Sequence, residues 1–195
     1  KPASWFYARK ISVPVALHAI LRLRLLFARA LDYPVDLDSP LVYGLERLSA
    51  TVPEILAATP YVVFIHGTTW ETKFWPETHW QALIARTLAA GRAVVLPWGT
   101  DAERERSLRL AQGYDAAQVW VPPQRTRLAE MAAIIRAAKG VVSVDTGLAH
   151  VAAALEVPMG VLYRVTDPSR VGALGPQVVH LASPVAPQYV KWFAS

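Results

Sequence analysis

Residues 141–150 have the sequence VVSVDTGLAH, and this segment predicts a strand followed directly by a helix. Three of its first four residues are valine, as in a strand that is covered on both faces. An Ala-rich segment continues to Leu155, and Pro158 lies just beyond its expected end. The helix therefore begins at the carboxyl end of a buried strand. Its first N–H groups have no intrahelical partner there and carry partial positive charge.

An anion-binding corner is one interpretation of this strand-to-helix junction. Asp145 and Thr146 lie at the turn, and Gly147 would let a ligand approach the backbone closely. His150 shares a helix face with Thr146 because the two residues are four apart. The alternative is purely structural, since Asp or Thr can serve as an N-cap and a single helical His is usually a packing or surface residue.

The composition indicates a globular domain. Of the 195 residues, 53% are hydrophobic and 18% are charged, which is sufficient for a real core. Cysteine is absent, so disulfides and thiolate metal sites are excluded. Arginines interrupt the apolar stretches before they reach the roughly 20 residues of a membrane span, and we expect no transmembrane helix. Lys1 is not a methionine, so we expect further residues upstream in the natural protein.

The positive charge is concentrated at one end of the chain. Residues 1–32 contain six basic residues and one acid, which accounts for the whole net charge of +5. A nucleic-acid binder would spread basic residues over a recognition surface, and we expect no nucleic-acid partner. An anionic membrane surface or an anionic substrate is one interpretation, and a solvated helix face is the other. The basic residues are Lys1, Arg9, Lys10, Arg22, Arg24 and Arg29.

Strand and helix patterns alternate in the rest of the chain, which predicts right-handed crossovers and a parallel sheet with helices on both faces. We expect this Rossmann-like α/β domain to span residues 61–182. Residues 1–60 would form a linker with a basic helix over residues 15–31, and residues 183–195 a C-terminal tail. Ligands of such sheets bind outside the carboxyl ends of the strands. The predicted strands are 61–65, 93–96, 118–121, 140–144, 160–163 and 178–181, and the helices 77–90, 102–112, 128–138 and 147–155.

Two other strand ends carry candidate ligand-binding residues. Thr68, Thr69 and Lys73 follow the first predicted strand, and two hydroxyls with a lysine can bind a diphosphate. A polar loop with a surface lysine is the alternative. Glu103 lies in the first turn of the helix after the second strand, where the helix dipole favours a carboxylate. It could also accept hydrogen bonds from ribose hydroxyls, although capping explains it equally well.

Several common site motifs are absent. The sequence has no G-x-G-x-x-G, no G-x-x-x-x-G-K-[ST] and no G-x-S-x-G, which excludes a standard dinucleotide fingerprint, a Walker-type NTPase and a nucleophile elbow. His and acidic residues do not cluster at metal-ligand spacing. We therefore expect no bound metal and no cofactor.

Taken together, four motifs resemble the heptosyltransferases of glycosyltransferase family 9, which use ADP-heptose. In chain order they are HGTT at 66–69, Lys73 with Trp-Pro at 75–76 and Trp80, LPWG at 96–99, and SVDTGLAH at 143–150. The resemblance extends over nearly the whole chain. Residues 4–7 and the helix around His18 look like the connection between the two domains of that family, whereas the residues after Ala182 match poorly.

The resemblance implies a GT-B fold, in which two Rossmann-like domains face a cleft. This chain looks like the C-terminal, donor-binding half. The N-terminal domain, with the acceptor site and the aspartate that acts as general base, would lie outside it, so we expect this half alone to be inactive. The implied reaction is inverting, metal-independent transfer of L-glycero-D-manno-heptose from ADP-heptose to Kdo of the lipopolysaccharide inner core. The acceptor would be Kdo-lipid A, and the protein would be cytoplasmic and peripheral at the inner face of the inner membrane.

The resemblance also implies a role for each matching residue. Lys73 would stabilise the leaving ADP, which is the one catalytic contribution expected of this chain. The segment at residues 122–127 departs from the family pattern, with Arg125 and Thr126 where Lys-Met is expected. A related glycosyltransferase with another nucleotide sugar, or a non-catalytic nucleotide-binding module, are alternative interpretations. The implied donor-binding residues are Thr68, Thr69 and Lys73 for the diphosphate, Glu103 for the ribose, Thr126 near the adenine, and Asp145, Thr146, Gly147 and His150 for the diphosphate and heptose.

Overall fold

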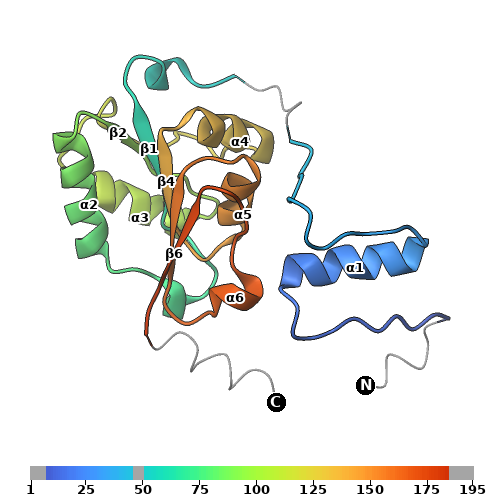
Figure 1. Ribbon diagram of the computed structural model, residues 1–195. Coiled ribbons are helices and arrows are strands. Elements are labelled where there is room, and N and C mark those ends of the chain that lie inside the picture. Colours follow the sequence, from blue (N-terminus) through green and yellow to red (C-terminus); the bar gives the residue numbers. More distant parts are fainter. Residues whose placement is uncertain (1–7, 46–50, 185–195) are drawn as a thin grey trace. The chain divides into compact units, whose positions relative to one another are not determined.

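The computed structural model describes residues 8–45 and 51–184 (Figure 1). The chain forms two compact units. Of the described residues, one unit holds those up to Leu41 together with Ser169–Val171. The other unit holds those from Val42 to Pro168 and from Gly172 to Pro184. Within the described ranges, no helix combines the length and the apolar character needed to cross a membrane.

The first unit contains helix α1, Ala19–Leu31. The helix begins later than predicted because His18 is its N-cap, with Nδ1 accepting a hydrogen bond from the N–H of Ile20 at 3.2 Å. It ends where Asp32 adopts a left-handed conformation with φ 57° and donates its N–H to the carbonyl of Ala28. The His18 side chain thus sets the start of the helix, and the left-handed backbone of Asp32 sets its end.

The second unit is built around a six-stranded sheet (Figure 1). Its strands are β1 Tyr61–Ile65, β2 Ala93–Val95, β3 Val119–Trp120, β4 Gly140–Val144, β5 Met159–Tyr163 and β6 Val178–Ala182. The spatial order is β3-β2-β1-β4-β5-β6, and every neighbouring pair is parallel. The predicted α/β fold with a parallel Rossmann-like sheet is confirmed. Because β1 lies beside β4, the strand order reverses between them, and ligands of such sheets bind at this point.

The four predicted helices of this unit are present within about two residues of their predicted ends. They are α2 Glu77–Ala89, α3 Asp101–Ala111, α4 Leu128–Ala137 and α5 Gly147–Ala154. Three short elements were not predicted, because a single turn is too short to show a hydrophobic period. They are the 3₁₀ turns η2 Glu54–Leu56 and η3 Glu71–Lys73 and the helix α6 Pro168–Val171.

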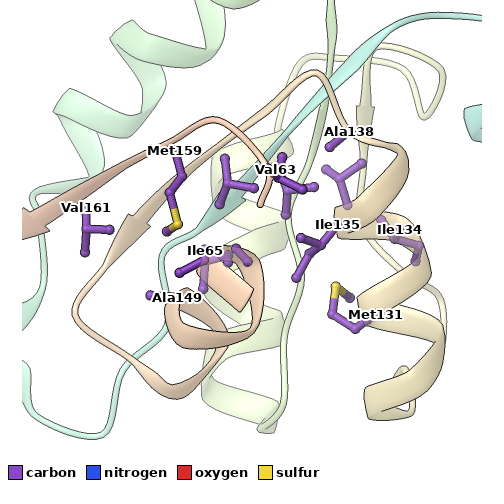
Figure 2. Packing of buried hydrophobic residues seen from close by; sticks show 14 of the residues in the cluster. Val63, Ile65, Met131, Ile134, Ile135, Ala138, Ala149, Met159 and Val161 are labelled. Atoms are coloured by element: carbon purple, nitrogen blue, oxygen red, sulfur yellow. The ribbon is translucent and has the colours of Figure 1, made fainter. Parts of the chain in front are cut away.

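Two hydrophobic cores lie on opposite faces of the sheet. Alternation along β1 sends Val63 and Ile65 to one face and Phe64 to the other. The first face packs against α4 and α5 through residues such as Ile135 and Ala149 (Figure 2). On the other face, α2 and α3 supply Trp80, Ile84 and Leu110. Helices therefore cover both faces of the central strands, whereas the edge strand β6 is largely exposed.

Candidate functional site

The loops after β1 and β4 bring distant residues together. Ile65 and Ser143, near the carboxyl ends of these strands, are paired in the sheet. Beyond them, Lys73 Nζ lies 2.7 Å from Asp145 Oδ2, although the residues are 72 apart in sequence. Thr68 also contacts this loop, because its Oγ1 donates a hydrogen bond to the backbone carbonyl of Asp145 at 3.3 Å.

The Lys73–Asp145 pair is largely shielded from water. The side chains are 19% and 9% exposed, respectively. The Lys73 ammonium also lies 5.1 Å from the centroid of the Trp70 ring. Each charge is thus compensated by the other, and an arriving anion would compete with Asp145 for the ammonium.

Helix α5 begins at Gly147, two residues after Asp145, and within the described residues no side chain caps it. Thr146 occupies the N-cap position in an extended conformation, but its side chain accepts no capping hydrogen bond. A Cβ added at Gly147 would meet no heavy atom within 4 Å, so the start of the helix faces open space. The Thr146 hydroxyl and the first N–H groups are therefore available to a ligand.

His150 lies half-buried one turn into α5. Burial lowers the pKa of His150 below its ordinary value. The nearby carboxylate of Asp145 raises the pKa and the ammonium of Lys73 lowers it. Burial thus favours the uncharged imidazole, which lies within electrostatic reach of the Lys73–Asp145 pair.

Glu103 combines helix capping with a position beside the loop after β1. Its Oε2 accepts hydrogen bonds from the N–H groups of Gly99 at 2.7 Å and Thr100 at 3.1 Å. The Thr100 hydroxyl accepts the N–H of Glu103 in return, which completes a capping box. Glu103 Oε1 faces Gly67, where an added Cβ would lie only 2.3 Å from it. Within the described part of the chain Oε1 has no hydrogen-bond partner, so capping leaves one carboxylate oxygen for a ligand.

Glu103 lines two hollows at the carboxyl edge of the sheet. A cavity of about 250 Å³ is lined by Gly67, Glu103, Thr126 and Thr146 together with apolar residues. A wider hollow of about 730 Å³ has Thr68 and Thr69 in its lining together with Glu103. The two hollows thus bring together five of the candidate residues, whereas Lys73, Asp145, Gly147 and His150 line neither of them. The five are Thr68, Thr69, Glu103, Thr126 and Thr146. Arg125, on the divergent segment, also lines the smaller cavity.

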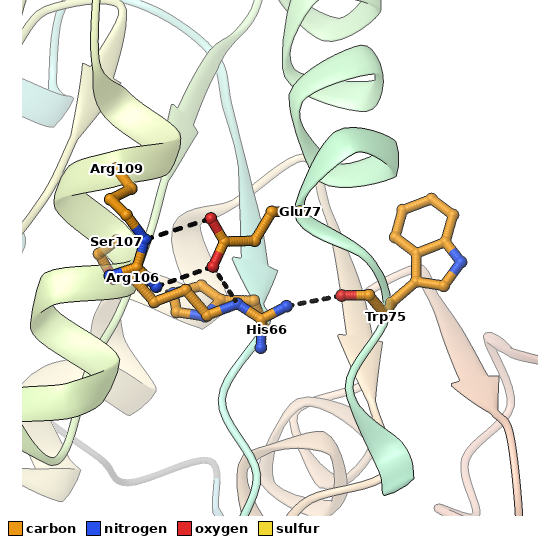
Figure 3. Close-up of polar contacts among 6 residues, drawn as sticks. All are labelled: His66, Trp75, Glu77, Arg106, Ser107 and Arg109. Atoms are coloured by element: carbon orange, nitrogen blue, oxygen red, sulfur yellow. Dashed lines mark hydrogen bonds and ion pairs between the residues drawn. The ribbon is translucent and has the colours of Figure 1, made fainter. Parts of the chain in front are cut away.

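A polar network that lines the wider hollow and extends into the core was not predicted from the sequence (Figure 3). Glu77 forms an ion pair with Arg109 at 2.8 Å and lies 3.7 Å from Arg106 Nε. The hydrogen bond from Arg109 lowers the pKa of Glu77. His66 Nε2 contacts Ser107 Oγ at 2.8 Å, and burial, with Arg106 nearby, lowers the pKa of His66 to about 3.

One sequence feature could have indicated this network. Arg106 stands four residues before Leu110, which places a charged residue on the buried face of α3. Long charged side chains are rarely buried without a specific partner. Over the described ranges, no group of three or more His or acidic residues is arranged to hold a metal ion.

Comparison with known proteins identifies the family. The model of glycosyltransferase family 9 (heptosyltransferase) matches residues 1–191. The chain belongs to this family. The resemblance predicted from the four sequence motifs is therefore confirmed.

Relatives within the family share this chain's fold over most of its length. Lipopolysaccharide heptosyltransferase 1 of Pseudomonas aeruginosa is 48% identical over 187 residues, which cover 95% of this chain and 51% of that protein. The structure of E. coli heptosyltransferase WaaC with ADP aligns with a TM-score of 0.81 at 37% identity, covering 98% of this chain and 60% of that one. WaaC with ADP-2-deoxy-2-fluoro heptose aligns at 0.77 over the same shares and at the same identity. The chain thus spans about half to three fifths of the length of these relatives.

Proposed function

We propose that this chain is the donor-binding half of an inverting heptosyltransferase that transfers L-glycero-D-manno-heptose from ADP-heptose to Kdo of the lipopolysaccharide inner core. The observation that carries the proposal is the Lys73–Asp145 pair at 2.7 Å, beside Thr68 and at the carboxyl ends of the adjacent strands β1 and β4. Membership of family 9 supports a heptosyltransferase, and the ADP bound to WaaC supports an ADP-linked donor.

The diphosphate would lie between Lys73 and the start of α5. Thr68, Thr69 and the first N–H groups of α5, at Gly147, supply neutral donors, and Lys73 supplies the positive charge. As the bond to heptose breaks, negative charge builds up on the departing ADP. Lys73 would stabilise the transition state, in which this charge develops, more strongly than it stabilises the bound donor. A preorganised hydrogen-bond donor lowers the reaction barrier in this way. In the free site, Asp145 holds the ammonium in position.

The nucleoside would occupy the cavity of about 250 Å³. Glu103 Oε1 is positioned to accept hydrogen bonds from the ribose hydroxyls, while Oε2 remains engaged in the capping box. Thr126 lies in the same cavity and would contact the adenine. Thr146 and the neutral imidazole of His150 would contact the diphosphate and heptose next to the Lys73–Asp145 pair. No step in this arrangement needs a metal ion or a cofactor.

The remaining machinery would come from outside this chain. The acceptor, Kdo-lipid A, and the general base belong to an N-terminal domain, so this half alone would be inactive. Residues 1–60 would connect the domains, residues 61–182 would bind the nucleotide sugar, and residues 183–195 would form a tail. Exposed apolar residues at four-residue spacing on α1, namely Leu23, Phe27 and Leu31, fit burial against that domain.

The cellular setting follows from the acceptor and from charge. The net charge of residues 1–32 is +5, which would favour approach to an anionic, membrane-borne acceptor. The protein would act in the cytoplasm, peripheral to the inner face of the inner membrane. Nucleic acid is not a partner in this proposal.

Titration calorimetry with ADP tests the diphosphate site. Lys73→Ala should weaken ADP binding by about 1.5–3 kcal/mol, the contribution of a charged hydrogen bond. Lys139→Ala is the matched control, because Lys139 is exposed and directly precedes β4, at the opposite end of the sheet. Unchanged ADP affinity in Lys73→Ala would remove Lys73 from the site.

Two further measurements separate the alternative functions. Competition between ADP-heptose, UDP-sugars and GDP-sugars for the chain would identify a different nucleotide-sugar donor. Full-length protein that retains Thr68, Lys73 and Asp145 should transfer heptose to Kdo-lipid A. If it binds ADP but transfers no sugar, a non-catalytic nucleotide-binding module becomes the better explanation.

A further inference from the structure

We propose that Arg106 is a positioning residue for Lys73. By fastening the segment Phe74–Glu77 to helix α3, it sets where the Lys73 ammonium meets the donor diphosphate. The inference rests on the proposed function, because it concerns the same site. Arg106 itself would not touch the donor.

The contacts of Arg106 converge on the residues directly after Lys73 (Figure 3). Its Nη2 donates a hydrogen bond to the carbonyl of Trp75 at 2.6 Å. The guanidinium lies 4.4 Å from the centroid of the Phe74 ring, and Nε lies 3.7 Å from Glu77 Oε1. The Arg106 side chain is only 9% exposed, so these contacts are made largely away from water.

The segment after Lys73 has little regular structure of its own to hold it. The 3₁₀ turn η3 ends at Lys73, and the chain stays extended at Phe74 until Pro76, the N-cap of α2. Among the described residues, the Trp75 carbonyl accepts its hydrogen bond from Arg106. Loss of that bond would remove the donor to a part-buried carbonyl. It would also weaken the attachment of the segment to α3, leaving the Glu77–Arg109 ion pair as the remaining link to that helix.

Helix α3 thereby connects the two ends of the proposed donor site. Glu103, in its first turn, is held by the N–H groups of Gly99 and Thr100 and does not depend on Arg106. Arg106, three residues later, holds the segment that follows Lys73. Removing the guanidinium should therefore disturb the diphosphate end and leave the nucleoside end intact. A general loss of structure would disturb both ends.

The ion pair with Glu77 is the weaker part of this arrangement. Glu77 retains Arg109 at 2.8 Å, whereas its distance to Arg106 is 3.7 Å. Arg106→Met keeps most of the aliphatic stem over Phe74 and removes the donor to Trp75. Arg106→Lys keeps the charge and one donor, and should restore part of the effect.

The test measures ADP and adenosine binding by calorimetry in the full chain. Arg106→Met should weaken ADP binding by about tenfold, as expected for coupled residues in one network, and change adenosine binding by less than about twofold. Arg106→Lys should recover part of the ADP affinity. Arg86→Met is the matched control, since Arg86 is exposed in the last turn of α2, and it should leave both affinities unchanged.

A double-mutant cycle with Lys73→Ala tests whether Arg106 influences ADP binding through Lys73. If Arg106 acts through Lys73, Arg106→Met should cause no further loss of ADP affinity in the Lys73→Ala background. An equal loss in both backgrounds would overturn the inference, as would a parallel loss of adenosine binding or unchanged ADP binding in Arg106→Met. If the unsubstituted chain binds no ADP, the proposed function fails first and this inference fails with it.

Discussion

Replacing Gly67 by alanine should displace Glu103 from both of its roles. An added Cβ would lie 2.3 Å from Glu103 Oε1 and 2.6 Å from its Cδ, distances that no packed structure tolerates. Gly67 is not among the glycines with positive φ, so alanine can adopt its backbone conformation. The Glu103 carboxylate would therefore have to rotate away and release the N–H groups of Gly99 and Thr100.

The expected cost follows from the bonds that are lost. Half of a capping box is worth about 1 kcal/mol in the free energy of unfolding. Loss of the charged contact to ribose should weaken ADP binding by about tenfold or more. Urea unfolding and calorimetry measure the two quantities independently. Gly160→Ala is the control, because its Cβ would make an ordinary contact of 3.7 Å with Leu181.

A second background makes this prediction specific. In Glu103→Ala the obstructing carboxylate is gone, so Gly67→Ala should then change stability by less than about 0.5 kcal/mol. If Gly67→Ala leaves both stability and ADP affinity unchanged, Glu103 does not occupy the position described. If the loss of stability is the same with and without Glu103, the conflict arises from another neighbour.

Two further predictions concern stability. Trp80 is fully buried against Phe64 and Trp75. Trp80→Ala should therefore lower the free energy of unfolding, measured in urea, by about 3–5 kcal/mol. Leu108→Ala, at an exposed position, is the control and should lower it by less than about 1 kcal/mol. His66 stays neutral in the fold because its pKa is lowered to about 3, while the unfolded chain takes up a proton below pH 6.5. Stability should therefore fall by about 2 kcal/mol between pH 7 and pH 5, and His66→Gln should lose less over the same range. An equal loss in His66→Gln would show that other groups carry the pH dependence.

The order and type of the main elements could be predicted because their causes are local. Valine-rich runs form the buried strands, and capping and glycine residues end the helices close to the predicted positions. Helix α3 illustrates this, since Thr100 and Glu103 are three residues apart and form their capping box within one turn. The sequence also indicated both possible roles of Glu103, as a helix cap and as a contact to a ligand.

The relations between strand ends could be anticipated only in outline. A parallel sheet implies that loops meet at one edge, but it does not say that β1 lies beside β4. The pairing of β1 with β4 places Lys73 in contact with Asp145, although 72 residues separate them in sequence. The same pairing allows the Thr68 hydroxyl to donate a hydrogen bond to the Asp145 carbonyl. The family resemblance implied that these residues bind the donor together, whereas the distances between them are determined by the fold.

The local sequence thus determines the helices and strands, where they end, and which side chains follow each strand. It can do so because hydrophobic periodicity and helix capping act over only a few residues. The spacing of Arg106 and Leu110 indicates that Arg106 lies on the buried face of α3, but its bond to the Trp75 carbonyl follows only from the packing of α3 against the segment before α2. The lowered pKa of His66 has the same origin. Burial and Coulomb interactions depend on which distant groups surround a side chain, and only the folded chain determines those neighbours.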